Sequence, residues 1–280
     1  MSTNTIRAAA LLCSALWLSF GPTAAAQGFT AAVSPPRFEV SVDPGSRSRQ
    51  VIEIVNPSPV PARFRVRTAD WSLGADASVT FHDTLQLGSC RPWVAIERTE
   101  LTIGAGARVR YRFEVAPPAD TAPTECRFAV LIEGDEPAVA RGSGLDIPVR
   151  GRIGVIVYVA VGAVAPQLEV VGSRVVTVGE QLTPALEIRN TGTAHGRLEG
   201  FLSGVDARGR NYEFAPSSFP VLPGETRVLQ LTPQPDGAQR GEVITLAFPV
   251  TVRGTLEWRG GRQPFEHRFE ASGSTAPGKR

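Results

Sequence analysis

Short runs of alternating apolar and charged residues, separated by turns that contain Pro and Gly, fill most of this chain. Segments 63–67 and 109–115 alternate in this way, which is typical of strands with one face in solvent. Segment 128–132 is continuously apolar, as expected of a strand in the middle of a sandwich. Because no long stretch has the period of a helix, the sequence predicts an all-β protein with antiparallel sheets.

The strand pattern occurs twice. Glu53-Ile54-Val55-Asn56, followed by Arg63, recurs as Glu187-Ile188-Arg189-Asn190, followed by Arg197, at a constant offset of 134 positions. In both copies a turn that contains Gly then opens another alternating strand. Shared spacing of this kind favours two copies of one fold class over chance similarity. We therefore expect two tandem immunoglobulin-like antiparallel β-sandwich domains.

The domain limits follow from this repeat and from the composition of the termini. The apolar strand 153–161 ends at Gly162, shortly before Pro166, which indicates domains at 27–162 and 163–271. Residues 272–280 are small and polar, so we expect a disordered tail.

The first 26 residues have the pattern of a cleaved export signal. Arg7 is their only charged residue, segment 8–20 is apolar, and Ala24-Ala25-Ala26 provides the small residues of a cleavage site. The apolar run is too short for a comfortable membrane span, which needs about 20 residues. We expect residues 1–26 to be removed as a signal peptide, so the mature chain is exported and is not inserted in a membrane.

Two cysteines, Cys90 and Cys126, remain after the expected cleavage. An even number in an exported chain favours a disulfide. The sequence alone leaves open whether the two residues lie close enough to pair.

Charge and motifs exclude several classes of function. The chain has 29 basic and 27 acidic residues without a basic patch, so we expect no nucleic-acid partner. Lys279 is the only lysine, so cationic roles fall to arginine. No nucleophile elbow or phosphate-binding loop is present, and Asp206 to Asn211 resembles a calcium loop only faintly. We expect no enzyme activity, no cofactor and no metal.

The remaining polar residues are too dispersed to define a catalytic site. The three histidines lie far apart in the sequence, and we interpret them as surface residues. The carboxylates are interpreted as solvated strand and loop charges, although a glycosidase pair among them stays an alternative. These carboxylates are Asp70, Asp76, Asp83, Asp120, Glu125, Glu133, Asp135 and Glu136.

The order of several segments in the first domain resembles the PapD-like periplasmic chaperones that assemble pili. The resemblance covers about 130 residues well and the second domain loosely, and it consists of spacing and pattern rather than a rare signature. The matching segments are Val33-Ser34-Pro35-Pro36-Arg37, Asp43-Pro44-Gly45, 101–106 with the strand 109–115, Cys126 to Val130, and Leu145 to Ile153.

The resemblance implies a function in strand donation. Such chaperones lend their last strand to a pilus subunit that lacks one, with alternate side chains in the subunit's groove. Leu145, Ile147 and Val149 provide apolar residues at period two in the matching segment. The alternative is that they face the core of their own domain. Pro148 removes one backbone donor, which only an edge strand tolerates.

The resemblance also implies a site for the subunit's terminal carboxylate. The family holds it with two basic residues in the cleft between the domains. Arg37 matches the first, whereas Gly154 stands where the family has a lysine. Arg150 or Arg152, on the same side of the strand as Gly154, could supply the second charge. The alternative is that both are ordinary exposed strand arginines.

The leading hypothesis is therefore a periplasmic chaperone-like protein that caps pilus or surface-fibre subunits by donating a strand. Its partners would be exported subunits and an outer-membrane usher. The alternative is a non-catalytic structural or adhesive envelope module with two immunoglobulin-like domains.

Overall fold

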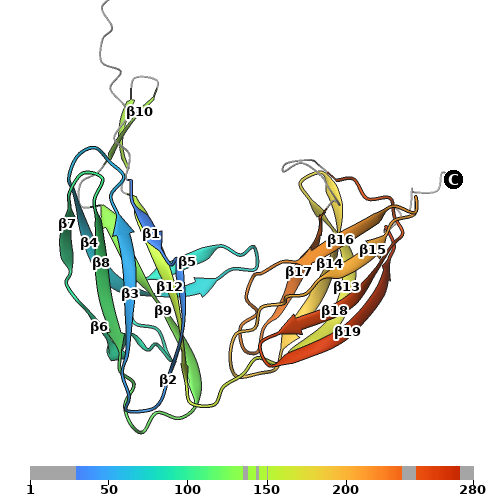
Figure 1. Cartoon of the computed structure of the whole chain (residues 1–280), viewed down its shortest axis with the longest axis horizontal. Coiled ribbons are helices and arrows are strands. Elements are labelled where there is room, and N and C mark those ends of the chain that lie inside the picture. Colours follow the sequence, from blue (N-terminus) through green and yellow to red (C-terminus); the bar gives the residue numbers. More distant parts are fainter. Residues whose placement is uncertain (1–29, 135–137, 143–144, 150, 235–243, 272–280) are drawn as a thin grey trace, which may run out of the picture.

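The computed structural model describes residues 30–134, 138–142, 145–149, 151–234 and 244–271, so the expected signal peptide and tail lie outside it. Strands dominate these residues, and the one helical element among them is the short 3₁₀ helix η1 (Arg91–Trp93). Figure 1 shows two β-sandwiches set at an angle. The all-β fold with two immunoglobulin-like domains is confirmed. Within the described part of the chain, no helix is long and apolar enough to cross a membrane.

The first twelve strands pair with one another and form the first domain. One sheet has the order β1-β3-β8-β6, and the other has the order β2-β12-β9-β4-β5 with β7 paired to β4. The strand bounds are β1 (Ala32–Ser34), β2 (Arg37–Val42), β3 (Ser48–Val55), β4 (Ala62–Leu73), β5 (Val79–His82), β6 (Val94–Ile96), β7 (Glu100–Ile103), β8 (Arg108–Val115), β9 (Thr124–Gly134), β10 (Ala138–Gly142), β11 (Leu145–Val149) and β12 (Arg152–Val161).

The predicted strands of the first domain are all present and pack as their patterns require. In β4 and β8 the apolar residues are buried and the alternating charged residues point away from the core. Tyr111 and Phe113 of β8 are buried, and Phe113 meets Phe128 of β9 edge to face with ring centroids 6.0 Å apart. Burial of such aromatic rings contributes much of the stability of a sandwich core.

The first segment of the domain changes sheets. β1 pairs with β3, and after Pro35-Pro36 the chain continues as β2 on the opposite sheet. β2 runs parallel to β12, and the pairing begins where Arg37 lies opposite Ile156. As a result, β2 covers the edge of β12 only from residue 156 onward.

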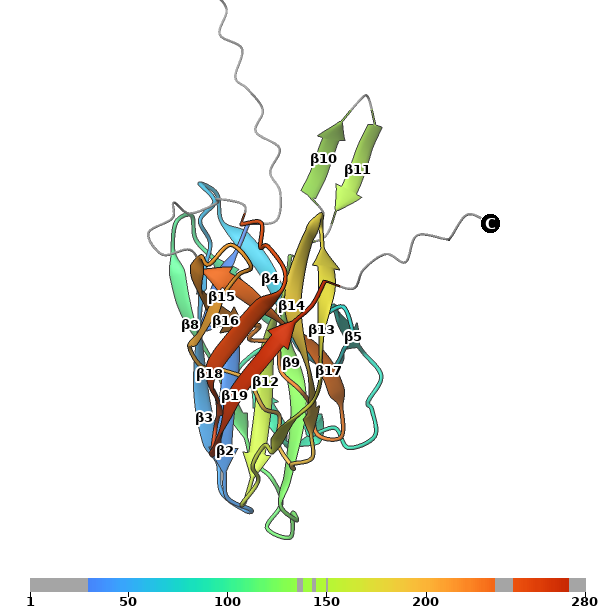
Figure 2. The same ribbon diagram turned by 90° about the vertical axis from the view of Figure 1, so that its right-hand side faces the viewer.

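The end of the first domain forms two strands, β11 and β12, whereas the resemblance implies one strand through Leu145 to Ile153. β11 ends at Val149, and β12 begins at Arg152 after Gly151. β10 and β11 pair with each other and form a hairpin that continues the β9–β12 hairpin beyond the sandwich (Figures 1 and 2). The described neighbours of β11 are β10 and no other strand.

The strands of the second domain form one hydrogen-bonded series with the order β13-β14-β17-β16-β15-β18-β19, and this sheet folds over into a sandwich in which β13 and β19 lie close together. Its core contains Leu186, Phe214 and Phe269, which are fully buried. The chain enters it after Gly162, which has a positive φ of 68°. The strand bounds are β13 (Leu168–Val178), β14 (Gln181–Asn190), β15 (Leu202–Val205), β16 (Asn211–Pro216), β17 (Thr226–Gln234), β18 (Val250–Trp258) and β19 (Gly261–Phe269).

The two asparagines of the sequence repeat have the same structural role. Asn56 is fully buried, and its Nδ2 donates to the carbonyl oxygens of Val60, Ile103 and Gly104 at 2.8–3.1 Å. Asn190 is also fully buried and donates to the carbonyl oxygens of Ala194 and Val221, both at 2.8 Å. Each asparagine thereby satisfies buried carbonyls in two different turns. The repeat at an offset of 134 thus reflects a buried asparagine that, in each domain, joins the end of a strand to neighbouring loops by hydrogen bonds.

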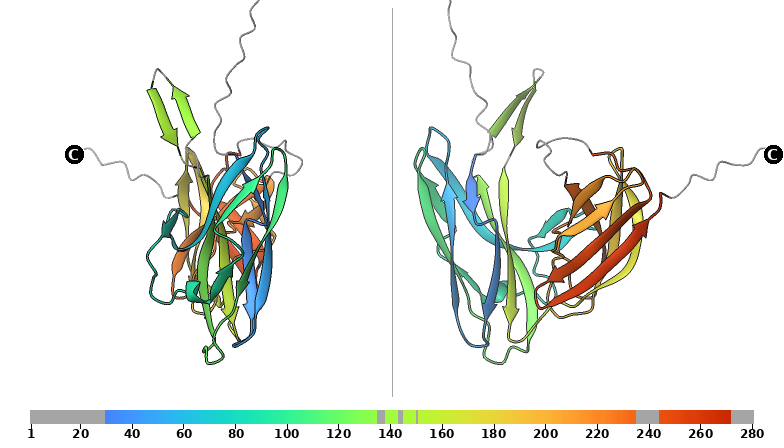
Figure 3. Two further views of the ribbon diagram at one scale, coloured as in Figure 1. Left: turned by 90° about the vertical axis from the view of Figure 1, so that its left-hand side faces the viewer. Right: turned by 45° about the vertical axis from the view of Figure 1, so that its right-hand side comes forward.

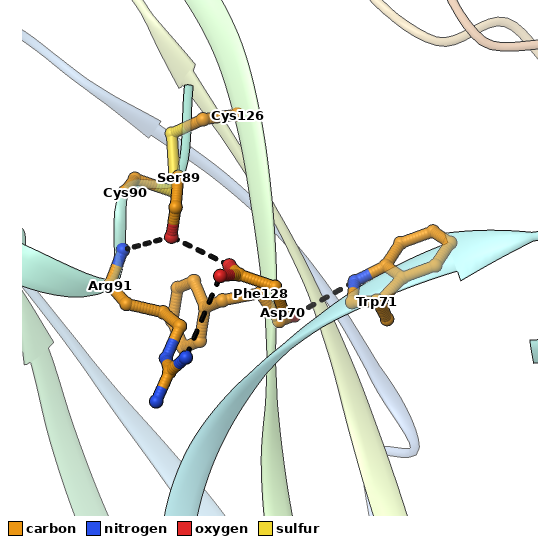
Figure 4. Close-up of a disulfide and its surroundings, with 7 residues drawn as sticks. All are labelled: Asp70, Trp71, Ser89, Cys90, Arg91, Cys126 and Phe128. Atoms are coloured by element: carbon orange, nitrogen blue, oxygen red, sulfur yellow. Dashed lines mark hydrogen bonds and ion pairs between the residues drawn. A yellow bond between two sulfur atoms is a disulfide. The ribbon is translucent and has the colours of Figure 1, made fainter. Parts of the chain in front are cut away.

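A disulfide and a buried carboxylate hold the loop between β5 and β6. Cys90 and Cys126 are bonded, with Cα atoms 5.8 Å apart. Figure 4 shows Asp70 beside this disulfide, where it accepts hydrogen bonds from the Ser89 hydroxyl and lies near Arg91. The loop is therefore tied to both β9 and β4, although it carries exposed leucines at its tip.

We predict that Asn56→Ala and Asn190→Ala each lower the free energy of unfolding by about 3 kcal/mol, because each removes four hydrogen bonds between a fully buried side chain and backbone groups. Urea denaturation monitored by intrinsic fluorescence measures the change. Asn211→Ala, at an exposed position of β16, is the matched control. A loss no larger than that of the control would contradict this role.

We also predict that replacing both Cys90 and Cys126 by Ala lowers the stability of the first domain by about 4 kcal/mol, because the disulfide closes a loop between residues 36 positions apart. Thermal unfolding with and without a reductant measures this. The reductant should destabilise the native protein and leave the double variant unchanged. Equal stability of native and variant proteins would show that the bond contributes nothing.

Candidate functional site

The two domains meet through an apolar cluster on the outer face of the β12 sheet. Trp71, Leu131 and Tyr158 of the first domain pack against Leu222 of the second. The β4–β5 hairpin reaches across to the second domain (Figures 1 and 3), where Arg227 Nη1 donates to the Gly74 carbonyl at 2.7 Å. The interface thus fixes residues of both domains relative to one another.

His195 of the second domain is clamped by three residues of the first. Its Nδ1 lies 2.8 Å from Glu125 Oε2, and its backbone N–H donates to Glu125 Oε1 at 2.7 Å. The ring stacks on Tyr158 with centroids 3.7 Å apart, and Nε2 lies 3.5 Å from Glu39. The prediction that the histidines are surface residues is wrong for His195, which is only 4% exposed, because the docking of the two domains covers it.

A cavity of about 370 Å³ lies beside this clamp, between the domains. Its charged residues come from β2 on one side and from the loop after β14 and the β18–β19 turn on the other. They are Arg37, Glu39, His195, Arg197, Glu199 and Arg259. With three arginines against two glutamates, the cavity can bind an anionic group.

Glu39 is the point on which the nearest cationic groups converge. Its Oε1 lies 3.3 Å from Arg37 Nε, 3.5 Å from His195 Nε2 and 3.6 Å from Arg197 Nε. Burial by itself would raise the pKa of Glu39, but the charges of His195, Arg37 and Arg197 outweigh it and hold this pKa below its usual range. Glu39 is therefore a carboxylate at neutral pH.

Arg197 is the more buried of the two arginines that pair with Glu39. Its side chain is 16% exposed, and its guanidinium carbon lies 5.8 Å from the centre of the Tyr158 ring. Burial lowers the pKa of Arg197. Its Nε has no hydrogen-bond partner among the residues that the structure describes. A buried donor of this kind can be satisfied by an incoming acceptor.

The structure separates the arginines that the sequence analysis grouped. Arg37 lines the cavity, whereas Arg152 pairs with Glu133 at 2.7 Å. Arg37 lies opposite Ile156 of β12. Arg152 lies four positions before Ile156, or about 13 Å along the strand. Arg150 lies outside the described residues.

Position 154 is covered by the Phe81 ring of the β4–β5 hairpin. A Cβ on Gly154 would lie 2.2 Å from Phe81 in its present position. A lysine here would therefore require the Phe81 ring to move aside. A second cation close to Arg37 comes instead from Arg197 of the other domain.

The apolar triplet of the expected donor strand lies on β11. In its register with β10, Leu145, Ile147 and Val149 are opposite Gly142, Ala140 and Ala138. These alternate positions share one face of the hairpin. Pro148 lies in a strand with a free outer edge in the described part of the chain, where proline is tolerated.

Among the described members of the scattered carboxylates, Asp83 and Glu133 come together where both bind Arg67, an arrangement that explains them as ion-pair partners. Glu133 also binds Arg152, and Asp76 binds Ser78. Asp135 and Glu136 lie outside the described residues. The described structure contains no group of three or more His, Cys, Asp or Glu residues arranged to hold a metal ion.

The faint calcium-loop pattern at Asp206 has a structural explanation. Asp206 is completely buried and accepts backbone hydrogen bonds from Arg208, Arg210 and Ala247 at 2.9–3.4 Å. Its oxygens also lie near Arg210 and the Tyr212 hydroxyl. Because N–H donors occupy its oxygens, this carboxylate organises a turn rather than binding a cation.

Sequence reasoning missed five of the six cavity residues, namely Glu39, His195, Arg197, Glu199 and Arg259. All except Glu39 belong to the second domain, whose role the sequence left open. Arg197 had been noted only as the repeat counterpart of Arg63. No pattern in the sequence shows which turn of the second domain faces β2.

No protein-family model and no curated protein matches the chain significantly. Among solved structures, the chain is similar to the Pseudomonas aeruginosa CupB2 chaperone, with 11% identity, a TM-score of 0.44, and coverage of 85% of this chain and 100% of that one. It is also similar to the E. coli chaperone DraB, with 14% identity, a TM-score of 0.42, and coverage of 88% and 97%.

A third similar structure is that of the Salmonella enterica SafA pilin in complex with the SafB chaperone, with 16% identity, a TM-score of 0.43, and coverage of 87% and 98%. All three are named as chaperones or chaperone complexes, the class that the sequence of the first domain resembles. Similarities at this level do not identify the residues of this chain that bind a partner.

We predict that His195→Ala lowers the free energy of unfolding by about 3 kcal/mol, because it leaves the buried Glu125 without its main partner. It should also loosen the domain interface, which small-angle X-ray scattering would detect as a larger radius of gyration. His267→Ala, which removes a histidine bonded only to Ser173, is the control. An unchanged radius of gyration in His195→Ala would contradict the clamp.

Proposed function

We propose that this protein is a periplasmic, non-catalytic chaperone-like protein that binds exported pilus or fibre subunits and caps them by strand addition. The observation that carries the proposal is the partly covered edge of β12. β2 pairs with β12 from residue 156 onward, so residues 152–155 and β11 have no strand on that side in the described structure. Native proteins normally protect such edges, so an extended free one favours a partner strand.

A strand added to this edge would lie in line with β2. The end of the added strand that is nearer to β2 would lie beside Arg37, the first residue of β2. If the added strand runs parallel to β12, that end is its carboxyl terminus, and if it runs antiparallel, that end is its amino terminus. Because Arg37 and Arg197 attract a carboxylate and repel an ammonium group, the charges favour the parallel direction.

The sequence of β11 is suited to filling a groove in the partner. Leu145, Ile147 and Val149 alternate along the strand, and a sandwich that lacks a strand needs apolar residues at that spacing. Opposite them, β10 offers only glycine and alanine. Small residues there leave the larger side chains of β11 as the main apolar contribution of this face.

Basic residues along the same edge would anchor the partner. Arg37 is the anchor for the terminal carboxylate. Arg152 lies further up the edge, and we propose that it and Arg150, which lies outside the described residues, contact the partner's backbone or acidic side chains. To do so, Arg152 would replace its ion pair with Glu133 by a contact with the partner. The partners would be exported subunits, with an outer-membrane usher as the receiver of the complex.

We predict that replacing Leu145, Ile147 and Val149 together by Ser abolishes the complex with co-expressed exported fibre subunits. The reason is that the donated face loses its apolar side chains while its backbone remains. Co-purification of the tagged protein from the periplasm measures the complex, and thermal unfolding checks that the variant is folded.

The matched control replaces Val171, Val178 and Leu182 by Ser, three residues of β13 and β14 that are 40–50% exposed in the second domain. This control should bind the subunits like the native protein. If the β11 variant binds equally well, or if the native protein binds no subunit, strand donation is refuted. The alternative of a structural or adhesive module would then be favoured.

A further inference from the structure

The cations of the interdomain cavity already hold one carboxylate, that of the chain's own Glu39. The Nε atoms of Arg37 and Arg197 and the Nε2 of His195 all lie within 3.3–3.6 Å of the same oxygen, Glu39 Oε1. One cation comes from the first domain and two from the second. The site is therefore shaped for a carboxylate and shared between the domains.

We propose that Glu39 is a built-in placeholder, which occupies this two-domain carboxylate site in the free protein and is displaced when a ligand's carboxylate group binds. The placeholder neutralises Arg37 and Arg197 and pairs with His195, and it lowers the affinity of the site by competing with the ligand. The inference deepens the proposed function, because the terminal carboxylate of a bound subunit would be one source of such a ligand.

The exposure of the residues fits an exchange of this kind. The side chains of Glu39 and Arg37 are 40% and 47% exposed, so the Glu39 carboxylate can rotate into solvent while β2 stays paired. Arg197 stays in place because it is buried and its Nη1 donates to the Ser218 carbonyl. An exposed ion pair such as that between Arg37 and Glu39 contributes little, so its exchange costs little.

The second glutamate of the cavity is in a different position. Glu199 lines the cavity and pairs through its backbone with Glu257, but no ion pair of its side chain is found among the described residues. Glu39 and Glu199 therefore carry the same charge in the same cavity, and only Glu39 contacts the cations. A comparison of variants of the two glutamates therefore separates direct competition for the arginines from a general effect of negative charge in the cavity.

Ligand binding at such a site would also stabilise the docking of the domains. A carboxylate held by Arg37 and Arg197 at once links β2 to the loop after β14. Anything that binds only the docked arrangement shifts the equilibrium toward it. The chemistry is that of a carboxylate group, whether it ends a peptide chain or belongs to a small free acid.

The experiment is an NMR titration of the native protein, Glu39→Gln and Glu199→Gln, with the backbone amides of residues 195–199 as reporters. The probes are acetate and a synthetic peptide of alternating Val and Thr, prepared with a free carboxyl terminus and with an amidated one. We expect Glu39→Gln to bind the free-carboxyl peptide with a Kd about tenfold lower than the native protein, because the competing charge is gone. Glu199→Gln should change the Kd less than about twofold.

The probes distinguish the sources of the carboxylate. Binding of acetate as tightly as the peptide indicates a small free acid, and tighter binding of the free-carboxyl peptide indicates a chain terminus. Both results support the placeholder when the affinity rises in Glu39→Gln alone. An equal effect of the two glutamate variants, an equal affinity for the amidated peptide, or no saturable shift in any protein would overturn it.

Failure of this inference and failure of the proposed function give different results. Loss of the placeholder effect leaves the dependence of subunit binding on β11 intact. Conversely, a protein that binds no fibre subunit but shows carboxylate binding strengthened by Glu39→Gln would retain the two-domain site without a role in strand donation.

Discussion

Main-chain pairing along β12 is the interaction on which the rest of this structure depends. β9 pairs with the backbone groups on one edge of β12 over its whole length, whereas β2 pairs with those on the other edge only from residue 156. The change of sheet between β1 and β2 sets this limit, because residues 32–34 pair with β3 instead. On that side the described residues 145–149 and 152–155 pair with no strand of the described structure, and Arg37 marks the end of this free edge.

The second domain supplies Arg197, which lies near Arg37 at the end of this free edge. The His195–Glu125 contact and the apolar cluster around Tyr158 hold the loop after β14 against β2, which brings Arg197 to within 3.6 Å of Glu39. The cavity exists only while the domains are docked, since its lining comes from both. Phe81 lies over Gly154 on β12, and the second arginine near Glu39 comes from the second domain.

Local sequence patterns predicted the strands with one exposed face and the repeated asparagines. Alternation in 63–67 and 109–115 predicted β4 and β8, and the repeated Asn56 and Asn190 follow from buried turn carbonyls that only a side-chain donor satisfies. Arg37 was found because it follows a recognisable first strand. His195 and Arg197 could not be found, because their role arises from contacts 70 or more positions away in sequence. The break between β11 and β12 was missed because an apolar alternation continues through it.

Amide hydrogen exchange of residues 138–161, with and without a bound exported subunit, tests the central claim most directly. The account predicts new protection of amides within 145–155 when the subunit binds. Amides of 156–161 should be unchanged because they already lie between β2 and β9. Protection that appears elsewhere, for example on the sheet of the second domain, while 145–155 exchange as in the free protein, would contradict strand addition at this edge.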